Sequence, residues 1–317
     1  MTIYADLTKC KAVMSQDINL GAQRLAIWAA LAACLSTSFG GSSFVAMRFL
    51  VTEADPITVA FLRNVGAAII LTPIAFIMIR RWPTFFQLAV IAVMGSVFFC
   101  GLQVVFATAL TYTTSGRAAM TYMTMPFMTL VLAVLFRAER VTIYKVSGIV
   151  IATSGVIVAL WQSSSTAPLD AWVGDFIILL GAFITAVFNV WSSRWLRLHE
   201  PLVVAVAGVL PGTILLFILA QFLDVPTFEV KLSINGWLAA AYIGLFGAAV
   251  SYMLWLWALR HTTPTLVAIS LPMNPFVALI LGSLLLDEPL TITMMAGFLM
   301  VLFGVFISNW RSRVKGV

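Results

Sequence analysis

The sequence predicts an all-α integral membrane protein of ten transmembrane helices, arranged as two inverted repeats of five. Three observations lead to this fold class. The chain of 317 residues is 62% hydrophobic and only 9% charged, whereas a soluble protein is about a quarter charged. Its apolar runs reach the roughly 20 residues that are needed to cross a bilayer. The stretch from Pro126 to Val156 also recurs from Pro275 to Val305.

The duplication rests on residue types that are rare in this chain. In each copy a proline is followed by a glutamate, a threonine and two glycines at the same spacing, and equivalent residues lie 149 positions apart. The first copy has Pro126, Glu139, Thr142, Gly148 and Gly155, and the second has Pro275, Glu288, Thr291, Gly297 and Gly304. With only 12 prolines and 12 acidic residues in the chain, chance does not explain the match. An internal repeat therefore guides the fold assignment.

Ten apolar spans follow from the pattern of long apolar runs and short connections with turn residues. They cover residues 25–51, 57–79, 85–110, 116–136, 142–161, 172–193, 201–223, 235–259, 265–286 and 291–310. We expect a polar N-terminal segment 1–24, a first repeat 25–161, a linker 162–171, a second repeat 172–310 and a C-terminal tail 311–317. The first apolar run is too long for a signal peptide, so we expect a retained helix.

The basic residues predict the orientation, because Lys and Arg accumulate in cytoplasmic loops. With a cytoplasmic N-terminus, 14 of the 18 cations fall on the inside, and the acids favour the other side. The inside cations are Lys9, Lys11, Arg24, Arg80, Arg81, Arg137, Arg140, Lys145, Arg194, Arg197, Arg260, Arg311, Arg313 and Lys315. We expect a multi-pass protein of the cell (inner) membrane with both termini in the cytoplasm.

Five helices are an odd number, so the second repeat must enter the membrane from the opposite face. Inverted repeats are typical of secondary transporters, in which the substrate binds near the midplane between the halves and alternating access moves it across. A channel or receptor is the alternative, and the duplication could also be only the way in which a large bundle arose.

Other function classes lack the residues that they need. The histidines are His199 and His261, both at loop edges, and no zinc-protease motif, paired membrane aspartates or Walker motif is present. We therefore expect no enzyme and no catalytic residue. Cys10, Cys34 and Cys100 have neither disulfide nor metal-site spacing, so no metal or cofactor is expected. The cations lie in short loops, which argues against a nucleic-acid partner.

The spacing of proline, Glu-Arg or Glu-Pro, threonine and Gly-Val resembles the EamA-type module of the drug/metabolite transporter superfamily, as does Pro56 followed by Arg63. Two such modules cover residues 25–310. The resemblance implies a central cavity lined by helices 1, 3, 4, 6, 8 and 9, with helices 5 and 10 at the periphery. It implies export of small metabolites, and the chain is most similar to exporters of amino acids, including aromatic ones. Arg63 has no counterpart in the second half.

Polar and aromatic residues inside the spans are candidates for substrate binding. An amide in hydrocarbon is costly unless it faces a partner or a wet cavity, and amides and hydroxyls can bind an amino acid's charged groups. Packing between helices is the alternative for each residue. The candidates are Ser43, Gln103, Asn189 and Asn274, with Tyr122, Trp191, Tyr252 and Trp255 as walls for an apolar or aromatic substrate.

Prolines and glycines inside the spans are candidates for gating. A proline removes a backbone hydrogen bond and kinks a helix, which places Pro126, Pro272 and Pro275 where spans 4 and 9 could bend. Gly40 and Gly41, in a run of small residues, permit close approach or local unwinding. Static kinks and close packing are the alternatives.

Charged residues bear on coupling to an ion. Arg63 lies deep in span 2, where Glu53 or Asp55 could reach it unless it snorkels to the interface. Asp175 lies near the outer start of span 6. Glu139 and Glu288 are expected to cap the starts of helices 5 and 10. No acid lies at the centre of a span, so facilitated diffusion and proton coupling both stay open, as do the exact substrate and the oligomeric state. Asp175 is the candidate proton site, and Asp175 and Arg63 are the possible coupling residues.

Overall fold

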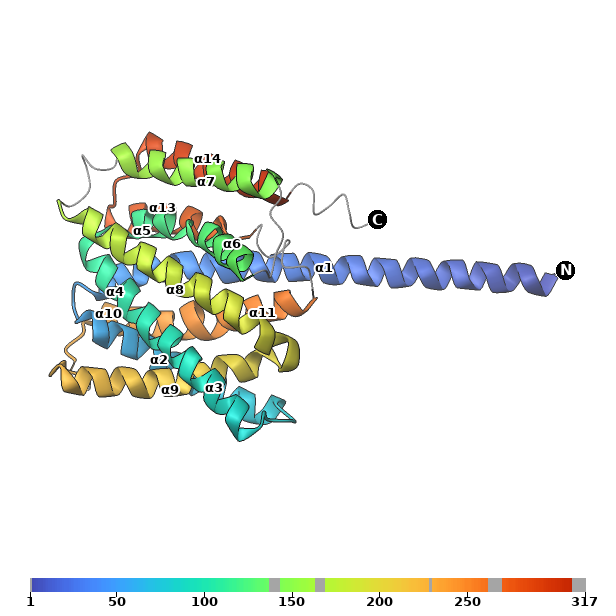
Figure 1. Cartoon of the computed structure of the whole chain (residues 1–317), viewed down its shortest axis with the longest axis horizontal. Helices are drawn as coiled ribbons and strands as arrows, with labels where there is room; N and C mark the ends of the chain where they lie inside the picture. The colour runs from blue at the N-terminus through green and yellow to red at the C-terminus, as the bar shows by residue number, and fades with distance from the viewer. Residues whose placement is uncertain (1, 137–142, 163–168, 228–229, 262–269, 310–317) are drawn as a thin grey trace.

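The computed structural model describes residues 2–136, 143–162, 169–227, 230–261 and 270–309, and all its regular structure in these ranges is helical (Figure 1). The first half contains α1 (Thr2–Leu50), α2 (Pro56–Met78), α3 (Phe85–Ser96), the π-helix η1 (Val97–Gly101), α4 (Leu102–Tyr112), α5 (Ser115–Tyr122), α6 (Met125–Leu135) and α7 (Ile143–Gln162). The second contains α8 (Ala171–Leu198), α9 (Pro201–Phe222), α10 (Ile234–Gly244), the π-helix η3 (Leu245–Val250), α11 (Ser251–His261), α13 (Met273–Leu286) and α14 (Ile292–Asn309).

These helices confirm the predicted fold class of a ten-helix membrane protein. Within the described ranges, six helical stretches are long and apolar enough to cross a membrane, and shorter apolar helices accompany them. Large apolar side chains face outward, among them Ile69, Phe76, Ile77 and Leu284. A bilayer provides the solvent that such a surface requires.

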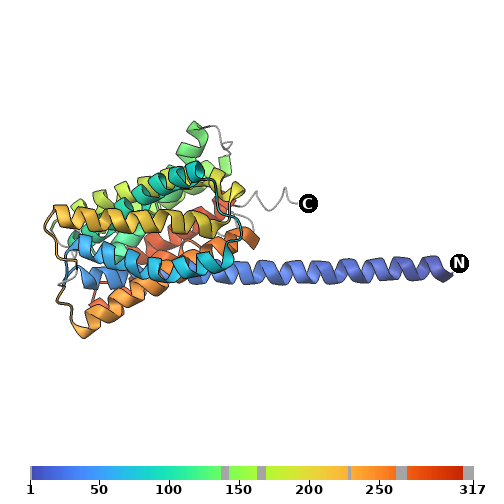
Figure 2. The same ribbon diagram turned by 90° about the horizontal axis from the view of Figure 1, so that it is seen from below.

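The first helix starts earlier than expected. α1 already begins at Thr2 rather than near residue 25, and both views show its first part projecting well beyond the bundle (Figures 1 and 2). Residues 2–24 contain no proline and one glycine, with several good helix formers. Polarity therefore marked where the apolar span begins, but not where the helix begins.

One core joins the two halves. Its buried side chains come from both, including Phe44 on α1, Leu110 on α4, Ile178 on α8 and Ile243 on α10. The halves thus share a single hydrophobic interior, and any motion of one against the other must occur across this shared surface.

The packing of α7 against α14 displays the inverted relation of the repeats directly. The two helices lie side by side (Figure 1). A methyl carbon on Gly155 would lie 2.6 Å from the carbonyl oxygen of Gly297, and one on Gly304 would lie 2.4 Å from that of Gly148. Gly148 is equivalent to Gly297, and Gly155 to Gly304, so exchanging the halves turns one contact into the other. A two-fold axis between α7 and α14 exchanges the two contacts in this way.

A second duplicated feature is the pair of π-helical segments. η1 covers Val97–Gly101 in span 3, and η3 covers Leu245–Val250 in span 8. The repeat offset of 149 places Val97 on Phe246 and Gly101 on Val250, so the two segments coincide apart from one residue. Such wide turns are rare and are frequent at functional sites.

Span 4 is interrupted next to Pro126, where the sequence predicted a kink. α5 ends at Tyr122 and α6 begins at Met125, so Pro126 is the second residue of a new helix, where a missing N–H is tolerated. In span 9, Pro272 precedes α13 and Pro275 is its third residue. In span 4 the site is therefore a break between two helices rather than a bend within one.

We predict that Gly297→Ala destabilises the protein by about 1–3 kcal/mol, because the new methyl group would lie 2.4 Å from the Gly155 carbonyl oxygen and 2.6 Å from Ala159 Cβ. Unfolding in mixtures of dodecylmaltoside and SDS would measure the loss. Gly101→Ala is the matched control, because its methyl group meets nothing within 4 Å. Equal stability of the two variants would contradict the close packing of α7 on α14.

Candidate functional site

One set of polar contacts between the repeats lies where α1 ends and α2 begins, which we call the Leu50 end. Among the contacts in the described ranges that join the repeats there are four residue pairs. They are Glu53 with Ser233 (Oε1 to Oγ, 2.7 Å), Thr58 with the Pro226 carbonyl (2.8 Å), Ser115 with Glu288 (Oγ to Oε2, 2.7 Å) and Arg117 with Asp175 (Nη2 to Oδ2, 2.5 Å). These pairs hold the repeats together at this end.

Two of these contacts are helix caps supplied by the opposite repeat. Glu53 accepts the backbone N–H of Ser233 at 3.0 Å, just before α10. Glu288 accepts the N–H groups of Ser115 and Gly116, at 2.8 and 3.3 Å, at the start of α5. A carboxylate there satisfies free N–H groups and opposes the helix dipole.

The expectation that Glu288 caps its own helix is therefore wrong. Thr291 does that instead, because its hydroxyl accepts the N–H of Met294 at 3.3 Å. Asp287 adopts a left-handed backbone (φ 52°) at the end of α13, just before Glu288, whose carboxylate then reaches α5. Glu139, the equivalent of Glu288, lies outside the described residues.

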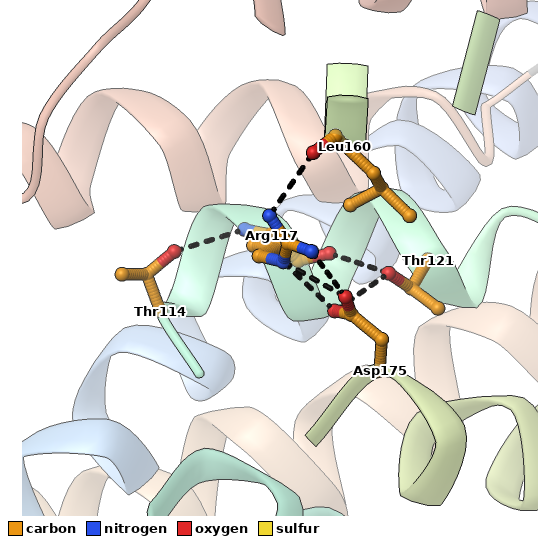
Figure 3. A network of polar contacts seen from close by, with 5 residues as sticks. All are labelled: Thr114, Arg117, Thr121, Leu160 and Asp175. Atoms are coloured by element: carbon orange, nitrogen blue, oxygen red, sulfur yellow. Dashed lines mark hydrogen bonds and ion pairs between the residues drawn. The ribbon is translucent and has the colours of Figure 1, made fainter. Parts of the chain in front are cut away.

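Arg117 on α5 and Asp175 on α8 form a buried ion pair (Figure 3). Arg117 Nε donates to both carboxylate oxygens of Asp175, at 3.1 and 2.9 Å, and Nη1 donates to the Leu160 carbonyl on α7 at 3.2 Å. The Thr121 hydroxyl adds a bond to Asp175 at 3.4 Å. Both charged residues are less than a tenth exposed. One guanidinium thus ties three helices from both repeats.

Arg63 on α2 is buried, with 7% exposure, so it does not snorkel. Its Nη2 donates to the Gly247 carbonyl in η3 at 2.8 Å, and its Nη1 contacts the Met47 sulfur at 3.5 Å. Neither predicted partner binds it, because Glu53 caps α10 and Asp55 accepts the N–H of Ile57 at 2.8 Å. Arg63 Nε is buried without a hydrogen-bond partner.

Candidate residues from several helices surround Arg63. Ser43 Oγ lies only 2.0 Å from where a side-chain carbon of Gly247 would stand, and it has no hydrogen-bond partner. Tyr122 and Tyr252 both pack against the core that contains Met47, the residue whose sulfur Arg63 contacts. We call Ser43, Arg63, Tyr122 and Tyr252 the central cluster. It draws on α1, α2, α5 and α11, and therefore on both repeats.

Aromatic rings pack around the central cluster. Tyr122 meets Phe106 edge-on, with centroids 5.0 Å apart, and Phe44 at 6.2 Å. Its hydroxyl lies 3.0 Å from the Thr185 hydroxyl on α8. Tyr252 meets Phe99 edge-on at 5.4 Å. The tyrosines thus combine apolar ring faces with polar hydroxyl groups.

Asn274 stands at the interrupted start of α13, against the glycines of α1. A methyl carbon on Gly41 would lie 2.2 Å from the Asn274 carbonyl oxygen, and one on Gly40 would lie 3.0 Å from its Nδ2. Both glycines therefore serve close packing. Asn274 is 8% exposed, and its Oδ1 has no hydrogen-bond partner. A buried acceptor without a donor is costly and calls for an explanation.

The remaining predicted residues lie in different surroundings. Gln103 is 1% exposed, and its Oε1 has no partner. Trp191 packs in a row with Phe188 and Trp195 on α8, and Trp255 packs against a small cluster around Ala33 and Ala258. Neither tryptophan has a described contact with the central cluster. The side chain of Asn189 lies outside the described ones.

Two consecutive residues of α2 bind the two π-helical segments. Asn64 Nδ2 donates to the Phe99 carbonyl in η1 at 2.9 Å, and Arg63 donates to the Gly247 carbonyl in η3. Carbonyl groups in irregular helical turns need such partners inside a membrane. The Arg63-Asn64 pair therefore connects the duplicated irregularities of spans 3 and 8.

The model of the EamA-like transporter family matches residues 27–161 and again residues 172–310. The chain belongs to the EamA-like transporter family. The two matches fall on the two repeats and cover most of the chain, so this EamA protein is a multi-pass membrane protein from a transporter family.

Curated relatives of this EamA protein are named as transporters. It is 28% identical over 284 residues to an uncharacterized transporter of Archaeoglobus fulgidus, covering 88% of this chain and 97% of the relative. It is 28% identical over 254 residues to the uncharacterized inner membrane transporter YedA of Escherichia coli K12, covering 79% and 80%. A crystal structure with 17% identity superposes with a TM-score of 0.65, covering 94% of this chain and 99% of the other, which supports the fold.

Sequence reasoning missed several polar residues of this EamA protein. Arg117 was not among the candidates, although it and Asp175 both fall in the first turn of spans that start at the same end. The sequence therefore held one signal, namely two opposite charges at the same expected depth in the membrane. The sequence held no such signal for Asn64 and Thr185, because their hydrogen-bond partners depend on how the helices pack.

We predict that Asp175→Leu and Arg117→Met each lower the free energy of unfolding by about 3–5 kcal/mol, because each leaves the charge of its partner buried and unpaired. The double variant R117M/D175L should recover much of the loss, since it buries no unpaired charge. Unfolding in dodecylmaltoside and SDS mixtures of all three would measure the coupling. Strictly additive losses would contradict a buried pair.

Proposed function

We propose that this EamA protein is a secondary transporter that exports small amphipathic metabolites, foremost amino acids, by alternating access of its two repeats. The observation that carries this proposal is the set of contacts at the Leu50 end, each of which joins one repeat to the other. If the repeats rock against each other, these contacts must break together.

The proposed cycle assigns the Leu50 end to the outside of the cell, with both termini in the cytoplasm. In this assignment the described conformation is closed outward, and the ion pair of Arg117 with Asp175 and the caps by Glu53 and Glu288 form an outer gate. The two-fold relation of the repeats supports a second conformation with an equivalent closure at the other end.

In the proposed mechanism the central cluster binds substrate between the repeats. It combines a cation, hydroxyl groups and aromatic rings from four helices, which suits a small molecule with a polar end and an apolar body. Asp175 then acts in the gate, where Arg117 and Thr121 engage it. That placement favours facilitated export over proton coupling through this residue.

Uptake into liposomes that contain the purified protein tests the carrier against a channel. We expect radiolabelled amino acids to enter with saturation and counterflow, and without a pH gradient. Flux that rises linearly with concentration and shows no counterflow would favour a channel. Uptake only with a gradient would restore Asp175 as a proton site.

Locking the outer gate should stop transport. We predict that E53C/S233C, in a background with the native cysteines replaced, loses at least 90% of its counterflow after treatment with a short bis-methanethiosulfonate linker, since the linked repeats cannot separate. Reductant should restore the activity. Both single-cysteine variants serve as controls, and unchanged transport in the linked protein would rule out a gate here.

We also predict that Asn274→Ala lowers transport at least tenfold, because it removes a candidate substrate-binding amide. Stability should not fall, because the Asn274 Oδ1 is a buried acceptor without a partner and its removal relieves a desolvation cost. Asn64→Ala is the matched control, since its amide donates to the Phe99 carbonyl and its loss should cost about 1–2 kcal/mol. Counterflow and detergent unfolding measure both effects. A stability loss in N274A equal to that in N64A would assign Asn274 to packing.

A further inference from the structure

Arg63 is a buried cation without an acid beside it among the described residues. The acids nearest to the Leu50 end have other partners: Glu53 binds Ser233, Asp55 binds Ile57, Asp175 binds Arg117 and Glu288 binds Ser115. Asp170, Glu200, Asp224 and Asp287 are exposed. The protein groups that Arg63 does contact, a carbonyl and a thioether, carry no charge.

An uncompensated charge in this position is expensive. A guanidinium stays protonated in proteins, and a buried ion loses its hydration without gain unless an anion or several hydrogen bonds replace the water. Arg63 has five N–H hydrogens, of which the carbonyl and the sulfur use two. Its Nε–H is buried and unpaired.

We propose that Arg63 binds the carboxylate of the transported molecule, and that the substrates are small monocarboxylates with an apolar or aromatic body. This inference rests on the proposed function, because it concerns the substrate of the same central cluster. The planar fork of a guanidinium matches the two oxygens of a carboxylate. Arg63 is fixed at Gly247 and Met47, which keeps the fork oriented.

The groups around Arg63 suit the rest of such a molecule. Phe44, Phe106 and Tyr122 form one aromatic group and Phe99 and Tyr252 another, which provides walls for an apolar body. Ser43 Oγ is an unpaired acceptor next to Gly247, and can receive an amino group when the substrate is an amino acid. The site offers one fixed cation and neutral acceptors. A substrate must therefore carry a carboxylate, whereas an amino group is tolerated but not required.

Affinities of four related probes for the wild-type protein test this requirement without any variant. Isothermal titration calorimetry on the purified full chain in detergent would compare 3-phenylpropionate and L-phenylalanine with 2-phenylethylamine and L-phenylalaninamide. We expect both carboxylates to bind at least tenfold more tightly than the amine and the amide. Equal or tighter binding of the amine or the amide, or no binding of any probe, would overturn the proposal.

Variants then assign the discrimination to Arg63. Arg63→Gln should weaken both carboxylates about 30-fold or more and leave the other two probes unchanged, so that selectivity disappears. Arg63→Lys should keep the preference for carboxylates at about tenfold lower affinity, because a point charge replaces the fork. Arg80→Gln, which removes an exposed arginine, is the control and should match the wild type.

A purely structural role of Arg63 gives a different result. In that case Arg63→Gln would weaken all four probes equally, which would refute the proposal. The wild-type comparison and Arg63→Lys keep the test valid if Arg63→Gln does not fold, as gel filtration would reveal. Binding of the carboxylates without any transport would contradict the proposed function but not this inference. Selective transport of the amine would contradict this inference but not the proposed function.

Discussion

The need to satisfy every backbone polar group without water governs this structure. Regular helices meet it internally, but η1, η3 and the turn before α13 leave carbonyl groups that require outside donors. Asn64 serves the Phe99 carbonyl, Arg63 the Gly247 carbonyl and Thr37 the Ser270 carbonyl. Two of these three donors lie on the opposite repeat from the carbonyl they serve. The irregular turns that permit a site between the helices therefore also bind the repeats to each other.

Duplication explains why these features occur in pairs. The glycines of α7 and α14 meet as a symmetric set, and the π-helical segments occupy equivalent positions. The polar side chains do not follow the symmetry, since Arg63 has no counterpart in the second half. Backbone irregularity is thus shared between the repeats, whereas the charge that can select a substrate belongs to one repeat. That division suits a scaffold that moves symmetrically around a single asymmetric site.

The sequence predicted the ten-helix fold and the inverted repeats, because hydropathy and the spacing of the repeated residues are local properties of the chain. It placed Tyr122, Tyr252 and Asn274 among the candidates on the same basis. It did not predict the partners of Glu288, Arg63 or Arg117, since these depend on which helix of the other repeat lies opposite. Helix caps supplied across the repeats leave no mark in the local sequence, and the partner of a buried charge follows only from the packing.

Arg117 and Arg63 show how the partner determines what a buried arginine does. Arg117 has Asp175, Thr121 and the Leu160 carbonyl, so its charge is neutralised and its donors tie helices together. Arg63 has a carbonyl, a sulfur and a free Nε–H, so its charge is oriented but not neutralised. The cost of leaving it so in an apolar interior falls when an anion arrives. An arginine that the protein fully satisfies suits a gate, and one that it satisfies in part suits a ligand.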